Sequence, residues 1–264
     1  MCSSDLGRWA FSSGVDVSQW NMLACQVIED DKVVDYRYCL LRREQYEILD
    51  DWYTLGMRGT GSRSVRCENV FVPEHRTMSM YAAKPGHEFP GLRIHTNPMY
   101  KVPTSSLGGH CIGGAIVGNA QAALDTTIEL VKSRSTAYTG ARMRDFQTVQ
   151  WRIGEAGAKI DAARLLLRND CLMADAAIKA GRPLDLNAKL RNKRNCALGV
   201  RMCVEAVDSL VEMAGANGIY DSYPLQRMFR DAHAAAAHIN FSRDVQFTPW
   251  ALVELGGEFR TPTM

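Results

Sequence analysis

Two stretches of the chain carry side chains whose chemistry goes beyond packing. The first contains Phe11, Ser12 and Ser13 and ends in Gly14. A hydroxyl group both donates and accepts hydrogen bonds, so Ser13 suits a partner that changes its protonation state. Serine and glycine are also ordinary turn residues, and the pattern by itself favours a simple turn. This stretch is therefore a candidate site, but its residue types alone do not distinguish a binding site from a turn.

The second stretch contains His238, in an alanine-rich segment whose apolar spacing predicts a helix. Histidine is the side chain that most readily exchanges a proton near neutral pH, although a lone histidine in such a helix is usually a packed core residue. His233 lies five residues earlier, about 140° around a helix, so the two rings cannot share a metal ion. We interpret His233 as structural and expect no metal site.

Arg134 lies near the end of one predicted helix, and the run 215–218, which includes Ala216 and Asn217, follows another. A guanidinium group is a planar, permanent cation that suits phosphate oxygens, but a surface arginine at a helix end is an equally good interpretation. The run 215–218 first indicates a helix C-cap with a left-handed glycine. Spacing alone identifies no ligand for either feature.

The periodicity of apolar residues changes once along the chain. Segments between glycine or acidic turns predict antiparallel strands at 8–11, 20–28, 33–41, 47–55 and 64–72, and residues 85–103 predict a linker. Further on, spacing of three and four residues predicts helices at 116–138, 146–180, 186–214 and 224–241. Asp185 or Asn187 is the expected N-cap of the third helix, and Pro224 the first residue of the fourth. The predicted fold class is α+β, a partial antiparallel β domain followed by an up-down four-helix bundle.

The composition excludes several classes of protein. With 46% hydrophobic and 23% charged residues the chain is an ordinary globular protein, and its net charge of +2 comes without a long basic run. No apolar stretch reaches the roughly 18 residues that span a bilayer. The eight cysteines form no Cys-x-x-Cys pair, and neither a Gly-x-Gly-x-x-Gly fingerprint nor a P-loop occurs. We expect a cytoplasmic protein that binds neither nucleic acid nor membranes and holds no NAD(P)H in a Rossmann motif.

Two motifs resemble acyl-CoA dehydrogenases. Residues 52–62, with the pattern W-x-x-x-G-x-R-G-T-x-S, and the following 70–73 resemble the end of that family's middle β domain. Residues 223–231 resemble its Y-P-x-x-R-x-x-R-D helix, and Arg134 falls between them in the family's order. The resemblance runs from Gly7 to about Phe241 and implies an N-terminally truncated chain. We expect residues 1–6 to be a non-native leader, 7–98 an incomplete middle β domain with its linker, and 99–264 the C-terminal helical bundle domain.

One position separates two activities within this resemblance. His238 and Ile239 align with a Tyr-Glu pair whose glutamate is the base of the dehydrogenases. An alkyl side chain cannot accept the substrate's proton. Residues 7–14 resemble instead the G-x-W-x-x-x-S-G stretch of two-component aromatic hydroxylases, such as the hydroxyphenylacetate and secosteroid-phenol monooxygenases, and residues 256–264 resemble the tail of the latter.

The resemblance to these hydroxylases implies a cofactor, partners and site residues. Reduced FMN or FAD, delivered by a separate NAD(P)H:flavin reductase, would react with O2 to give a C4a-hydroperoxyflavin that hydroxylates a phenolic ring. Ser13, with the backbone of Phe11 and Ser12, would face the flavin N5, and His238 beside Ile239 would be a base or hydrogen-bond partner of phenol and peroxide. In a homotetramer, Arg134 would reach the flavin phosphate. Ala216 and Asn217 would approach the flavin from a neighbouring subunit.

Two other functions remain open from the sequence. One is an acyl-CoA dehydrogenase whose base stands on another helix, and the other is a non-catalytic helical scaffold of the same fold. We also expect that activity belongs to the intact protein, and not to this chain without the missing N-terminal part.

Overall fold

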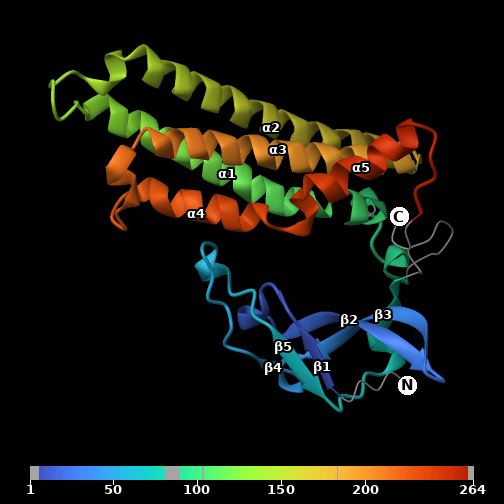
Figure 1. Ribbon diagram of the computed structural model, residues 1–264. Coiled ribbons are helices and arrows are strands. Elements are labelled where there is room, and N and C mark those ends of the chain that lie inside the picture. Colours follow the sequence, from blue (N-terminus) through green and yellow to red (C-terminus); the bar gives the residue numbers. More distant parts are fainter. Residues whose placement is uncertain (1–5, 81–89, 103, 183, 261–264) are drawn as a thin grey trace. The chain divides into compact units, whose positions relative to one another are not determined.

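The computed structural model describes residues 6–80, 90–102, 104–182 and 184–260. The chain divides into two compact units, Met1–Ile94 with Arg260–Met264, and His95–Phe259. The first unit contains the strands and the second contains the long helices (Figure 1). Of the expected leader, residues 1–5 lie outside the described range, whereas Leu6 is the first residue of a strand.

Within the described residues, the strands form two three-stranded antiparallel sheets. One has the order β1-β5-β4, with β1 at Leu6–Trp9, β5 at Val65–Glu68 and β4 at Glu47–Ile48. The other has the order β2-β3-β6, with β2 at Trp20–Glu29, β3 at Lys32–Arg42 and β6 at Thr77–Ser79. Asp30 and Asp31 turn the β2–β3 hairpin with φ of 47° and 60°. Aspartate tolerates this left-handed conformation better than most residues, which is why the chain reverses in this acidic run.

A small apolar core holds the first unit together, because inward side chains alternate with solvated ones. In β5, Val65 and Cys67 are buried while Arg66 and Glu68 are exposed. Burial raises the pKa of the Cys67 thiol, so this side chain remains an uncharged apolar group. The buried members of the core are Val15, Leu23, Cys39, Leu41, Tyr46, Val65 and Cys67.

The predicted strand 47–55 is wrong beyond Ile48, because side-chain hydrogen bonds replace the ladder there. Asp51 accepts the backbone N–H of Ser64 at 2.9 Å and the guanidinium of Arg8 at 3.0 Å. The Ser64 hydrogen bonds, and then Arg8, hold the pKa of Asp51 below its ordinary value, so this anchor of the loop stays ionised. Strand β6 has no counterpart among the predicted strands, since three residues show no period.

Gly61, in the same loop, is a position where any other residue would strain the fold. Its φ is 56°, and a Cβ placed there would clash with Oδ2 of Asp16. We expect Gly61→Ala to lower the free energy of unfolding by about 1–3 kcal/mol, through the left-handed backbone and the displaced carboxylate. Gly59→Ala is the matched control, because nothing lies within 4 Å of a Cβ at Gly59. Urea denaturation measures both variants, and equal midpoints would contradict the prediction.

The second unit consists of helices arranged around α3. The described helices are α1 at Thr104–Ser133, α2 at Gln147–Lys179, α3 at Leu186–Glu212, α4 at Pro224–Ala236 and α5 at Arg243–Glu254. Helix α3 contacts each of the other four, and Figure 1 shows α1 to α4 running alongside one another. As predicted, Asp185 caps α3 by accepting the N–H of Ala188 at 2.7 Å, and Pro224 is the first residue of α4. Among the described helices, none is long and apolar enough to cross a bilayer.

Two differences from the predicted helices bear on the candidate site. Helix α4 ends at Ala236, so His238 lies outside it and the angular argument about His233 and His238 does not apply. The helix ends there because the His238 side chain caps a 3-10 turn, Ile239–Phe241. Helix α5 was not predicted, since Pro249 interrupts its apolar pattern. The antiparallel sheets and the helical bundle confirm the α+β class, with one helix more than expected.

A hydrogen-bonded polar cluster lies inside the bundle. Asp170 of α2 has no exposed surface; one of its oxygens lies 3.1 Å from Nε2 of His110 on α1, and the other accepts Nδ2 of Asn195 on α3 at 2.9 Å. Arg194 donates to the Asn195 side chain, and its guanidinium lies 3.9 Å from the ring centroid of Trp250 on α5. The Asp170 carboxylate therefore links α1, α2 and α3, and Arg194 extends the cluster to α5.

Candidate functional site

The first unit holds a pocket of about 370 Å³ between the segment after β1 and the start of β2. Phe11 has a φ of 57°, which is uncommon for an aromatic residue. Phe11 is 75% exposed, and its ring meets Trp52 edge-on, with 6.2 Å between the ring centroids. Strained, exposed backbone of this kind often marks a functional site. The residues that line the pocket are Trp9, Ala10, Phe11, Ser12, Ser13, Ser18, Trp20, Asn21, Met22, Leu23 and Ala24.

The structure brings Phe11, Ser12 and Ser13 together at this pocket, and it gives the two serines different surroundings. Ser12 is buried, and its backbone N–H donates a hydrogen bond to the carbonyl of Arg63 at 3.0 Å. Its hydroxyl accepts a hydrogen bond from Nδ2 of Asn21 at 2.8 Å. Ser13 is exposed, and its Oγ lies 3.0 Å from Oγ of Ser62. A hydroxyl can make more than one hydrogen bond, so Ser13 can bind a ligand while Ser12 fixes the turn.

Asn21 and Ser62 are site residues that the sequence analysis did not identify. Ser62 is the last residue of the 52–62 motif, which was a usable signal, whereas nothing in the sequence singled out Asn21. The next residue, Arg63, pairs with Asp16 at 3.3 Å and with Asp50. Burial lowers the pKa of Arg63, but the two carboxylates outweigh it and raise that pKa, so the loop is held by a permanent cation.

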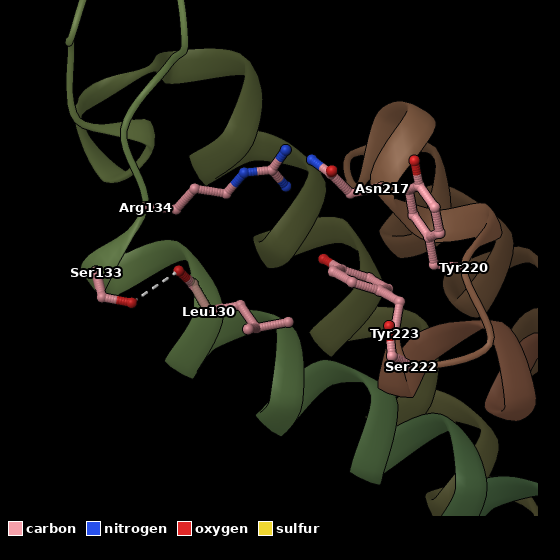
Figure 2. Close-up of a pocket in the computed structure, with 7 residues that line it drawn as sticks. All are labelled: Leu130, Ser133, Arg134, Asn217, Tyr220, Ser222 and Tyr223. Carbon is pink, nitrogen blue, oxygen red and sulfur yellow. Dashed lines mark hydrogen bonds between the residues drawn. The ribbon is translucent and has the colours of Figure 1, made fainter.

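The second unit has a pocket of about 450 Å³ near the ends of α1 and α3. Figure 2 shows the Arg134 guanidinium and the Asn217 amide pointing toward one another, with the Tyr223 hydroxyl directed into the same space. The Arg134 nitrogens lie 3.4 and 3.5 Å from the carbonyl oxygen of Ala214, which is long for hydrogen bonds, so the fork can engage a ligand. The pocket is lined by Leu130, Ser133, Arg134, Asn217, Tyr220, Ser222 and Tyr223.

The 3-10 helix Gly215–Ile219 supplies Asn217 to this pocket. Gly215 has the predicted left-handed conformation, with a φ of 58°. Ala216 neighbours Asn217 but does not line the pocket. Tyr220 and Tyr223 were not identified from the sequence, although Tyr223 opens the 223–231 motif.

His238 and Ile239 lie in the turn between α4 and α5. Both are exposed, Ile239 by 59%. Their neighbour Asn240 packs so closely on Gly109 of α1 that a Cβ at Gly109 would lie 3.2 Å from the Cβ of Asn240. Gln246 of α5, which is buried, donates Nε2 to the carbonyl of Ile239 at 2.9 Å. The turn is therefore fixed beside the N-terminal half of α1.

The His238 turn and the Arg134 pocket lie at opposite ends of α1. At a rise of about 1.5 Å per residue, the helix from Gly109 to Ser133 is about 36 Å long. The two groups of one chain are therefore too far apart to contact the same small ligand. Within the described residues, no three His, Cys, Asp or Glu side chains are placed to hold a metal ion.

Residues 110–243 match the family described as acyl-CoA dehydrogenase, C-terminal domain. The oxygenase subunit HsaA of a flavin-dependent monooxygenase from Rhodococcus jostii (strain RHA1) is 37% identical over 233 residues, which are 88% of this chain and 61% of that protein. The oxygenase component of FADH(2)-dependent resorcinol hydroxylase from Rhizobium sp. (strain MTP-10005) is 33% identical over 248 residues, which are 90% of this chain and 60% of that protein.

Solved structures agree with the sequence comparisons. The crystal structure of 3-HSA hydroxylase from Rhodococcus sp. RHA1 matches with a TM-score of 0.92 at 34% identity, over 98% of this chain and 67% of that one. The chain spans 60–61% of the length of the two curated relatives. It therefore belongs to the acyl-CoA dehydrogenase-fold family that includes the oxygenase subunits of flavin-dependent monooxygenases.

Proposed function

We propose that the whole protein is the oxygenase component of a two-component flavin-dependent monooxygenase that hydroxylates a phenolic substrate. The relatives that are 33% and 37% identical carry names of this kind. The turn at His238 is the observation that favours this function over a dehydrogenase. Where the resemblance places a glutamate base, the chain presents the exposed alkyl side chain of Ile239 beside an imidazole. Abstraction of a substrate α-proton has no acceptor at that position.

The donor sets of the two pockets fit a reduced FMN or FAD. The Arg134 fork and the Asn217 amide suit phosphate or ribose oxygens, and the exposed Ser13 hydroxyl suits a ring nitrogen that is protonated in one redox state. The exposed Phe11 of the first pocket offers a flat apolar surface for a ring system. When bound, the reduced flavin supplies the electrons that activate O2 for transfer to the substrate. The protein's part is to hold the ring, exclude water and orient the phenol.

The length of α1 supports a site in which each flavin is held by two subunits, as in the homotetramer that the resemblance implies. Because Arg134 and His238 of one chain are too far apart for one cofactor, Arg134 and Asn217 would serve a flavin whose ring lies against the His238 turn of another copy. This arrangement makes each site incomplete without a neighbouring subunit. Its decisive test uses mixed assemblies of two variants.

The proposed partners are a separate NAD(P)H:flavin reductase, O2 and an aromatic small molecule, in the cytoplasm. The test uses the full-length protein with a flavin reductase, NADH and a panel of phenols that includes resorcinol. We expect a hydroxylated product that requires both proteins, with NADH consumed only by the reductase. Reduction of an artificial electron acceptor by an acyl-CoA, without any reductase, would instead establish a dehydrogenase. Colourless protein with no affinity for reduced flavin would favour a scaffold.

Ser13→Ala tests the proposed flavin contact of the first pocket. Losing one hydrogen bond worth about 1–1.5 kcal/mol should raise the ratio of hydrogen peroxide to hydroxylated product by about tenfold. Ser62→Ala is the matched control, since it removes the partner of Ser13 but keeps the hydroxyl itself. Product and peroxide are measured together, and equal coupling in the two variants would count against this role of Ser13.

A further inference from the structure

A buried glutamine joins helix α5 to the turn between α4 and α5. Gln246 is 5% exposed, and its Nε2 donates a hydrogen bond to the carbonyl of Ile239 at 2.9 Å. The backbone N–H of Ser242 also donates to this carbonyl, at the longer distance of 3.2 Å. A buried amide is costly to leave without a partner, so the side-chain hydrogen bond is kept and holds the Ile239 peptide. The direction in which Ile239 presents its exposed side chain therefore depends on Gln246.

The helix that supplies Gln246 is itself fixed to α3. The Arg194 guanidinium of α3 lies 3.9 Å from the ring centroid of Trp250 on α5, and Nε1 of Trp250 donates to Oδ1 of Asn187 at 3.3 Å. Arg194 also donates to Asn195, a member of the buried polar cluster. Because α5 is anchored in this way, its hydrogen bond to the turn comes from a rigid support.

Helix α1 limits movement of the same turn through a glycine. A Cβ at Gly109 would lie 3.2 Å from the Cβ of Asn240, so the turn and the helix are already in close contact. The side chains of His238 and Ile239 nevertheless remain exposed. A fixed backbone with exposed side chains is the arrangement that holds groups at a reacting site in one geometry.

We propose that Gln246 is a positioning residue for the hydroxylation and acts through the backbone of Ile239. The inference rests on the proposed function and gives α5 a part in it. With the hydrogen bond present, the alkyl side chain of Ile239 stays in place as an apolar wall that excludes water. Without it the turn moves and water enters. The two electrons of the reduced flavin then reduce O2 to hydrogen peroxide, and no oxygen atom passes to the phenol.

Two variants remove the hydrogen bond while keeping the size of the side chain. Gln246→Met has a similar length and no donor, and Gln246→Glu has the same shape but places an acceptor beside the Ile239 carbonyl. Thr248→Val is the matched control on α5. Its exposed hydroxyl donates to the carbonyl of Asp244 at 2.7 Å, within the helix and not to the turn.

The ratio of hydrogen peroxide to hydroxylated product tests the proposal. Reduced flavin is bound under nitrogen to an excess of folded full-length protein and then mixed with oxygenated resorcinol. Because all the flavin is bound, the ratio does not depend on how much protein is folded, and a merely structural role leaves it unchanged. We expect both Gln246 variants to raise the ratio by about tenfold, the factor that one ordinary hydrogen bond contributes, and Thr248→Val to keep the wild-type ratio.

Hydrogen exchange of the full-length protein without flavin gives a second readout. In Gln246→Met, the amides of residues 239–242 should exchange about tenfold faster, because the turn opens more often. The amides of α2 and α3 should keep their wild-type protection, since the lost hydrogen bond is local.

Each other outcome overturns the inference in a recognisable way. A wild-type ratio in Gln246→Met, with faster exchange or without it, means that Gln246 only stabilises the fold, and it leaves the proposed function standing. A raised ratio with unchanged exchange contradicts positioning through the turn. If Gln246→Glu does not fold, Gln246→Met decides alone. Absence of product from the wild-type protein with every phenol of the panel would overturn the proposed function together with the inference.

Discussion

Asp170→Ala is expected to lower the free energy of unfolding of the helical unit by about 3–5 kcal/mol, the cost of breaking a buried pair on one side. Asp170 has no exposed surface, and each of its oxygens has a side-chain partner, His110 or Asn195. Without the carboxylate both partners are buried with an unmet hydrogen bond. Nδ1 of His110 has no hydrogen-bond partner among the described residues, so the ring would lose the side-chain hydrogen bond that Asp170 gives it.

The same helix supplies the control for Asp170. Asp175 pairs with Lys179 one turn away at 2.7 Å, and the side chain of that lysine is 63% exposed. Solvated pairs of this spacing contribute about 0.3–0.5 kcal/mol, so Asp175→Ala should scarcely move the transition. Thermal unfolding followed by circular dichroism compares the two. A similar loss in both variants would mean that the buried cluster is not a distinct source of stability.

The sequence predicts the elements wherever periodicity is uninterrupted. The β2–β3 hairpin, α2 and α3 lie within a few residues of their predicted bounds, since each shows its period over ten or more residues. Helix α1 begins at Thr104 rather than at 116, because glycines at its start weaken the apolar pattern while allowing close packing. A Cβ at Gly113 would lie 3.2 Å from Sγ of Cys196.

The site residues were predictable only in part, because contacts between distant segments leave no trace in spacing. Ser12 and Ser13 stood out by type, but Asn21 and Ser62 reach them from other elements. The alanine-rich sequence around His238 predicts a helix there, whereas α4 ends at Ala236. The chain turns at His238 because Nδ1 of His238 accepts the backbone N–H of Asn240. The periodicity of apolar residues carries no information about this hydrogen bond.

Arg134→Gln is expected to weaken binding of reduced flavin by about 10–100-fold, the loss of charge-assisted hydrogen bonds worth about 1.5–3 kcal/mol. The guanidinium makes only long contacts, at 3.4 and 3.5 Å, to the Ala214 carbonyl, so the fold depends on it little. Arg142→Gln is the control, because Arg142 lies in the same connection and pairs with Asp145 at an exposed site. Equilibrium dialysis of reduced flavin under nitrogen gives the affinities, and equal affinities would remove Arg134 from the flavin site.

Mixed assemblies then show whether Arg134 acts on a neighbour's flavin. If Arg134 and His238 of different copies complete one site, co-expressing Arg134→Gln and His238→Asn chains creates some sites in which both residues are native. Activity of the mixture should then rise well above that of either variant alone. If one chain supplied both residues, every site would keep one defect and mixing would recover nothing. The length of α1 argues for recovery, because about 36 Å of helix separates the two residues within a chain.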